Sequence, residues 1–189
     1  LEGITNDIIL DVKGELLYKC GLKLKNDGYT IRVLNLKDPE LSDRYNPFAY
    51  IEKEEDLIKL IANIQQSLTP PDSMSNDPFW QQGVALYLQS TFYYEWFMAK
   101  EEGRTATFNN VLKLINDETK YDTSVEVEEG EKPPTILQMK MNAISEKYGE
   151  DNPAVRDYRK LKEGATETVR SIIIITNAML KLCETKALQ

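Results

Sequence analysis

The chain of 189 residues contains no histidine and only two cysteines, Cys20 and Cys183. Catalysis by a Ser–His or Cys–His pair is therefore excluded. A zinc site is not expected either, because such a site needs clustered Cys and His side chains. The two cysteines lie far apart, each in a segment of helical pattern, which favours reduced and packed thiols over a disulfide. We assign no catalytic residue and no metal ligand.

Long hydrophobic runs are also missing. The four consecutive isoleucines at 172–175 are followed at once by Thr176 and Asn177, so this stretch is far too short to span a bilayer. No signal-peptide pattern opens the chain. The first residue is Leu rather than Met, as in a trimmed piece of a longer protein. A membrane segment elsewhere in a parent protein therefore stays open, and this piece itself is expected to be soluble.

The chain has fewer basic than acidic residues. The 31 acidic residues outnumber the 23 basic residues, giving a formal net charge of −8. Tight, sequence-independent binding to nucleic acid needs a basic surface, so the balance argues against it and favours a protein partner with a basic face. The most basic stretch comprises Arg156, Arg159, Lys160, Lys162 and Arg170. These are our candidates for contact with DNA phosphates, although a solvated helix face is the favoured alternative.

The phosphate-binding loop of a P-loop nucleotide hydrolase is absent too. That loop is rich in glycine and ends in Lys-Ser or Lys-Thr, and a second acid on a strand holds magnesium and water. Neither pattern occurs in this sequence. Lys13-Gly14 is no substitute, because no glycines precede it. We expect no ATP hydrolysis by this chain alone.

The beginning of the chain carries its most informative pattern. The apolar run 8–10 ends at Asp11, and a helical pattern over 15–26 separates it from a second apolar run at 29–36. This order predicts a βαβ unit with polar residues at the carboxyl edge of the sheet, where ligands bind. Two parallel strands are too few for a stable covered sheet. The pattern therefore indicates a piece of a larger nucleotide-handling protein.

The candidate site at this edge consists of Asp11, Lys13, Gly14 and Glu15. Three charged groups at the end of a strand are costly without partners, which favours a ligand, a metal-bound water or a neighbouring subunit. Alternatively, Asp11 caps the helix and Glu15 lies in its first turn beside the positive end of the helix dipole. The spacing favours neither interpretation.

The remainder of the chain reads as helical. Cap residues, stop residues and the helical period predict six helices. One starts at 54, one runs from 78 to the glycine at 103, one starts at 108, and three more cover 135–148, 153–162 and 166–187. The aromatic helix starting at 78 is expected to be central and buried, because base stacking by its rings would require interleaved basic residues. The acidic segment 122–134 is expected to be a solvated linker.

Several of these segments resemble the TraG/TraD family of conjugative ATPases, the coupling proteins of type IV secretion. Residues 9–16, Ile-Leu-Asp-Val-Lys-Gly-Glu-Leu, resemble the family's strand and Asp-Pro-Lys-Gly-Glu motif. Further likenesses follow in the family's order: 33–36 to the next strand, 42–48 to an Asn-Pro loop, 77–80 to the opening of a helix, and 168–172 to a returning helix. Val12 stands where the family usually has Pro, which leaves the role of Lys13 open.

The resemblance implies a mainly α fold in which a helical bundle is attached to a small βαβ piece of a RecA-like P-loop motor domain. Residues 1–51 would be the partial nucleotide-binding domain, comprising strand, helix, strand and exit loop. Residues 52–189 would be the all-alpha substrate-recognition domain. Asp11, Lys13, Gly14 and Glu15 would map near the nucleotide side or a subunit boundary.

The resemblance also implies a function. Intact members are anchored at the cytoplasmic face of the membrane, use ATP and Mg²⁺, and assemble as homohexamers that move DNA. The helical domain would recruit a relaxase or another protein substrate, with single-stranded DNA and other type IV secretion components as further partners. This piece would hold no cofactor, and the sequence leaves its own oligomeric state open, a monomer included. The alternatives are a nucleotide-binding enzyme domain with a helical lid, and a DNA-binding helical module.

Overall fold

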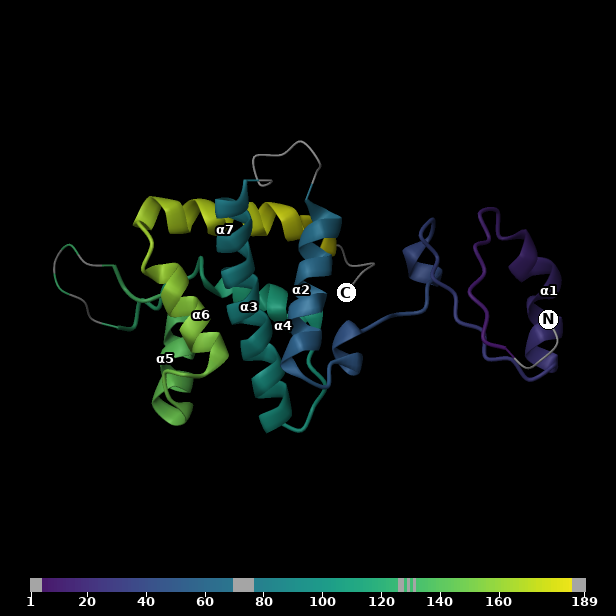
Figure 1. Cartoon of the computed structure of the whole chain (residues 1–189), viewed down its shortest axis with the longest axis horizontal. Helices are drawn as coiled ribbons and strands as arrows, with labels where there is room; N and C mark the ends of the chain where they lie inside the picture. Colours follow the sequence, from purple (N-terminus) through teal and green to yellow (C-terminus); the bar gives the residue numbers. More distant parts are fainter. Residues whose placement is uncertain (1–4, 70–76, 126–127, 129, 131, 185–189) are drawn as a thin grey trace. The chain divides into compact units, whose positions relative to one another are not determined.

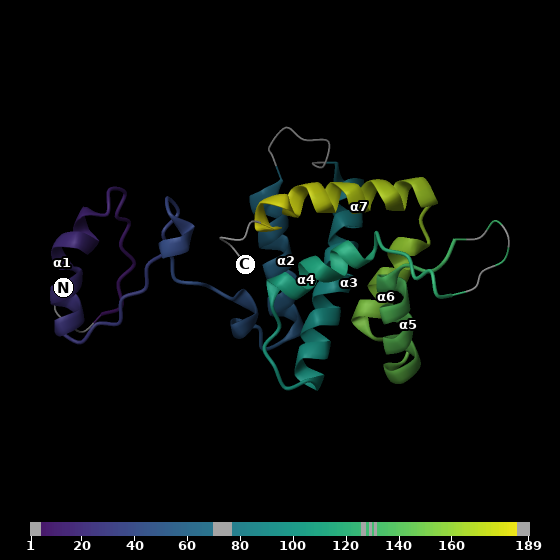
Figure 2. The same cartoon turned by 180° about the vertical axis from the view of Figure 1, so that it is seen from behind.

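The structure, a computed structural model, describes residues 5–69, 77–125, 128, 130 and 132–184. The chain divides into two compact units, Leu1–Tyr45 and Asn46–Gln189. In the described residues, regular structure is helical, and the only strand-like pairing is an isolated antiparallel bridge between Tyr121 and Thr135. The expected mainly α fold is confirmed, and Figures 1 and 2 show its helices from two sides.

The first unit is built around helix α1, Glu15–Asn26, which has the bounds that the sequence predicts. Gly14 precedes the helix with φ of +73°, and Gly28 follows it with φ of +92°. Both values lie in the left-handed region that glycine adopts without strain. A short 3-10 turn, η1, covers Pro39–Leu41.

The predicted βαβ unit is not formed in the described residues, and this expectation is corrected. Residues 8–10 and 29–36 pair with no strand, and several of their large apolar side chains are exposed, with Leu10 88% and Leu36 83% exposed. The second run instead bonds to the loop that follows it, because the Asp43 carboxylate accepts a hydrogen bond from the Val33 amide at 2.7 Å. In the described residues these two segments have no further strands with which to complete a sheet.

The second unit is a helical bundle. Its helices are α2 (Glu54–Leu68), α3 (Pro78–Glu101), α4 (Phe108–Asp117), α5 (Ile136–Tyr148), α6 (Pro153–Lys162) and α7 (Thr166–Leu180). The 3-10 turns η2 (Pro47–Tyr50) and η4 (Lys181–Glu184) flank them. Within these residues, no helix combines the length and apolar character that crossing a membrane demands.

Helix α3 is the centre of the bundle, as predicted. It packs against α2, α4, α6 and α7, and α7 lies across one end of α2 and α3 in both views (Figures 1 and 2). Its apolar residues surround the helix rather than forming one stripe, which is the pattern of a helix buried on most sides. Tyr87, Leu88 and Phe92 are fully buried.

The close crossing of α3 and α7 depends on a glycine. A Cβ atom added to Gly83 would lie 2.5 Å from Cδ1 and 2.9 Å from Cγ1 of Ile172, which is itself buried. We expect Gly83→Ala to lower the free energy of unfolding by about 1–3 kcal/mol in urea denaturation followed by helical circular dichroism. The same change in an open helix would stabilise it by about 1 kcal/mol. Unchanged or increased stability would therefore show that this crossing is loose, and Gln82→Ala, on the exposed side, is the matched control.

Local signals place most of the helix starts. The side chains of Asp77, Thr107, Thr135 and Asn152 accept hydrogen bonds from amides in the first turns of α3, α4, α5 and α6, respectively. These caps satisfy amides that lack a partner inside the helix. The last helix is shorter than predicted, since α7 ends at Leu180, and residues 185–189 lie outside the described residues.

Two backbone hydrogen bonds bring together the two ends of the acidic segment 122–134. The Asp122 amide donates to the Pro134 carbonyl at 3.0 Å, and the Ile136 amide donates to the Lys120 carbonyl at 2.8 Å. Four of its positions, 126, 127, 129 and 131, lie outside the described residues. The prediction that this segment is a solvated linker therefore stays a prediction.

Candidate functional site

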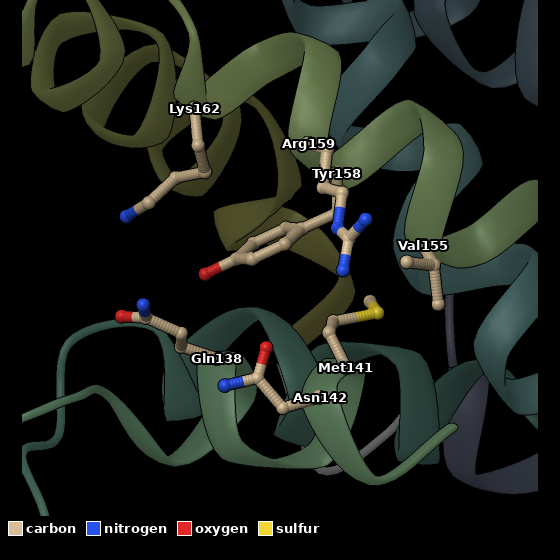
Figure 3. A pocket seen from close by; sticks show the side chains of 7 residues that line it. All are labelled: Gln138, Met141, Asn142, Val155, Tyr158, Arg159 and Lys162. Atoms are coloured by element: carbon tan, nitrogen blue, oxygen red, sulfur yellow. The ribbon is translucent and has the colours of Figure 1, made fainter. Parts of the chain in front are cut away.

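A hollow of about 180 Å³ lies between helices α5 and α6 of the bundle. Figure 3 shows side chains of both helices facing each other across it. Four of the lining side chains are polar or charged: Gln138, Asn142, Arg159 and Lys162. Three provide apolar surface: Met141, Val155 and the ring of Tyr158. We call this site the α5–α6 groove.

Glu118, just after α4, organises one end of the groove. Its buried carboxylate accepts hydrogen bonds from Tyr158 Oη at 2.7 Å, Lys162 Nζ at 2.9 Å and Thr135 Oγ1 at 3.2 Å. Burial, and then the neighbouring Glu118 charge, raise the pKa of Tyr158, so its hydroxyl stays protonated and donates. Three donors, from α6 and from the start of α5, therefore converge on one carboxylate, which fixes the positions of Tyr158 and Lys162 in the groove.

Asp117 repeats this arrangement on the adjacent surface. Its carboxylate accepts from Lys140 Nζ at 2.7 Å and from Lys120 Nζ at 3.0 Å. Burial alone would raise the pKa of Asp117, but the two ammonium groups outweigh it and hold the pKa below its ordinary value. Asp117 is therefore ionised at neutral pH, and both lysines are drawn to the same side of the bundle.

Arg159 follows Tyr158 on α6 and also lines the groove. Its guanidinium donates to Ser145 Oγ at 3.1 Å and pairs with the Glu150 carboxylate at 2.7 Å. The Glu150 side chain is 74% exposed, so this ion pair is solvated. In Figure 3 the Arg159 guanidinium and the Asn142 amide point into the same gap.

The structure separates the five candidate DNA contacts of the sequence analysis. Arg159 and Lys162 line the groove. Arg156 pairs with the buried Asp157 at 3.0 Å, and that hydrogen bond raises the pKa of Arg156. Arg170 lies near Glu167 at 3.7 Å. Lys160 is exposed and, among the described residues, has no hydrogen-bond or ion-pair partner. These side chains do not form one continuous basic surface free of acids.

The candidate motif of the first unit is used largely within its own helix. The Asp11 carboxylate accepts from the Leu17 amide at 2.9 Å, so it satisfies a donor in the first turn of α1. Glu15 pairs with Lys19 at 3.3 Å on the exposed face. Lys13 is exposed, and no other described residue bonds to it. This geometry is that of a helix start stabilised by Asp11, and its relation to a nucleotide stays a prediction.

Sequence reasoning did not find several residues of the groove. The missed residues include the polar ones Glu118, Gln138, Asn142, Glu150 and Tyr158, as well as the apolar Met141 and Val155. A usable signal existed for the amides, because Gln138 and Asn142 are four residues apart and thus share one helix face. No local sequence pattern indicates that Glu118 contacts Lys162, because Lys162 is 44 positions further along the chain. In the described residues, no group of three acidic or cysteine side chains is arranged to hold a metal ion.

Together these features define a mainly helical protein with a solvent-open polar groove on one side of its bundle. A family model described as "Type IV secretory system Conjugative DNA transfer" matches residues 4–184. The chain therefore belongs to this family of conjugative DNA transfer in type IV secretion. Neither the curated proteins nor the solved structures give a match.

Proposed function

We propose that this chain is part of a coupling protein of the TraG/TraD type, and that its helical unit recruits the protein–DNA substrate to the type IV secretion channel. The single observation that carries the proposal is the family match over 4–184, which takes in the whole described bundle. The bundle has its own core around α3 and leaves the α5–α6 groove open to solvent. A rigid core with a polar groove suits recognition, because binding then costs little ordering of the chain.

A protein substrate such as a relaxase is favoured over bare DNA as the first contact. Phosphate binding requires a surplus of basic side chains, whereas this chain carries a net charge of −8. Four of the five candidate DNA-contacting residues lie beside an acidic side chain in the bundle: Arg156, Arg159, Lys162 and Arg170. Single-stranded DNA then comes with the relaxase, rather than being held by this unit alone.

The first unit fits an incomplete motor domain. Its apolar segments 8–10 and 29–36 leave large side chains exposed, as unpaired strands of a RecA-like sheet would. In the intact protein, other strands would cover them, and the whole would bind ATP and Mg²⁺, assemble as a hexamer at the cytoplasmic face of the membrane and drive DNA transfer. Asp11, Lys13, Gly14 and Glu15 would then lie at the nucleotide side or at a subunit boundary.

The proposal is tested by retention of the relaxase of the same conjugation system on the immobilised chain. The relaxase is applied after nuclease treatment, and again with single-stranded DNA, over a series of salt concentrations. We expect retention without DNA, with a shallow salt dependence. Retention only through DNA, lost steeply with salt, would instead support the DNA-binding module and would direct attention to Arg156, Arg159, Lys160 and Arg170. No retention under either condition would contradict the recruitment role.

A further inference from the structure

On the side of the bundle that carries α5 and α6, two acidic side chains, Glu118 and Asp117, are buried, whereas the lysines that pair with them reach solvent. The Lys162 side chain is 36% exposed, whereas its partner Glu118 is 3% exposed. Lys140 and Lys120 likewise lie outside Asp117. A ligand that approaches Glu118 or Asp117 therefore meets their lysines first, while the exposed Glu150 is the acid beside Arg159. At physiological salt, charges further than about 8 Å away are largely screened, so the local groups decide.

The groove matches the size and chemistry of one short side chain. Its volume of about 180 Å³ is smaller than the pockets of about 300–1,000 Å³ that hold drug-sized molecules. Met141 and Val155 supply apolar walls, while Gln138 and Asn142 offer amide groups that can pair with a peptide backbone. A groove of this size and lining suits one side chain of an extended peptide better than a nucleotide.

Glu150 shows which kind of group the Arg159 guanidinium binds, namely a carboxylate. The two side chains pair at 2.7 Å, but Glu150 is 74% exposed and Arg159 is 44% exposed. Such exposed pairs contribute little free energy, so a carboxylate supplied by a ligand can take the place of Glu150 at small cost. The planar guanidinium fork also favours a carboxylate over a neutral acceptor.

We propose that the α5–α6 groove binds an acidic side chain of an extended segment in the protein substrate, and that this carboxylate displaces Glu150 from Arg159. The inference rests on the proposed recruitment function and deepens it by naming the recognised chemistry. A short segment with one or two carboxylates is favoured over a DNA strand, because a longer polyanion would also meet exposed acids near the groove, such as Glu146 and Glu163. The exposed Glu150 carboxylate at the edge of the groove further disfavours a DNA strand relative to a short peptide.

The inference is tested by fluorescence anisotropy with the full chain and a labelled pentapeptide that carries two glutamates around a central leucine. The same peptide with glutamines in their place, and labelled oligothymidylate, are the comparison probes. We expect the glutamate peptide to bind most tightly. Arg159→Gln should weaken its binding roughly tenfold or more, as expected for loss of a charge-assisted hydrogen bond. Glu150→Gln should tighten it by roughly two- to fivefold, because the competing carboxylate is gone.

Lys160→Gln is the matched control, because it removes one charge from the same helix without touching the groove. We expect its effect to stay within about twofold. A disturbed fold cannot imitate the result, since Arg159→Gln and Glu150→Gln are expected to act in opposite directions. The inference is overturned by equal binding of the glutamine peptide, by an Arg159→Gln effect no larger than that of Lys160→Gln, or by preference for oligothymidylate.

The relaxase experiment separates this inference from the function on which it rests. If the relaxase is retained equally by the unchanged chain and by Arg159→Gln, the recruitment role holds and the groove is not its site. If the glutamate peptide binds as expected but the relaxase is not retained, the chemistry of the groove holds and the recruitment role fails. If Arg159→Gln loses both, the groove is the recognition site.

Discussion

Replacing Glu95 with alanine is expected to lower the free energy of unfolding of the helical unit by about 3–5 kcal/mol. The carboxylate is 2% exposed and accepts hydrogen bonds from Arg104 at two positions, from the Thr107 amide at 3.0 Å and from Asn110 Nδ2 at 3.1 Å. Its removal leaves the Thr107 amide and Asn110 Nδ2 without this acceptor, and it leaves Arg104 with Glu102 alone. Urea denaturation followed by circular dichroism measures the loss.

The chain offers a matched control for this prediction. Glu102 also pairs with the Arg104 guanidinium, but its side chain is 50% exposed. The hydrogen bond with Glu95 is the largest influence that raises the pKa of Arg104, ahead of Glu102. Glu102→Ala should therefore change stability by less than about 1 kcal/mol. Equal effects of Glu95→Ala and Glu102→Ala would show that Glu95 does not tie the end of α3 to the start of α4.

Replacing Phe92 with alanine should cost about 3–5 kcal/mol, through a large cavity at the centre of the bundle. The side chain is fully buried, and its ring centroid lies 5.4 Å from that of Phe48 and 5.8 Å from that of Phe108. These rings come from η2, α3 and α4, so one truncation loosens three segments. The same denaturation measurement applies, with thermal melting as a second readout.

Phe79 is the control for the aromatic truncation. It also lies on α3 and makes an edge contact with Trp80, but it is 58% exposed. Phe79→Ala should change the free energy of unfolding by less than about 1 kcal/mol. If Phe92→Ala were as mild as Phe79→Ala, the core would have to repack without leaving a cavity, and the central role of α3 would be wrong.

The boundaries of most helices could be predicted because the information is local. Asp77-Pro78, Thr107 and Asn152-Pro153 combine an oxygen that accepts a helix amide with, in two cases, a residue preset for the first turn. The structure confirms these starts. The aromatic pattern of α3 likewise identifies the buried centre, since a helix that is apolar on most sides has to be covered on most sides.

The strand predictions failed for a different physical reason. The runs 8–10 and 29–36 have the composition of buried strands, but a strand is held by hydrogen bonds to neighbours that can lie anywhere in the sequence. In the described residues no such neighbour is present. The four isoleucines of α7 show the converse, because their preference for strand is overridden by the helical period of the residues around them and by packing against α3.

The sequence by itself determined the mainly helical class, most helix boundaries, the buried centre and the resemblance that the family match supports. These follow from periodicity, capping and composition, which act over a few residues. Only the tertiary structure decided which charges meet. It buried Glu118 beneath Tyr158 and Lys162, and it set Arg159 against Glu150 beside the amides of α5. Such sites depend on contacts between distant segments, and no local rule states which acid a given base will find.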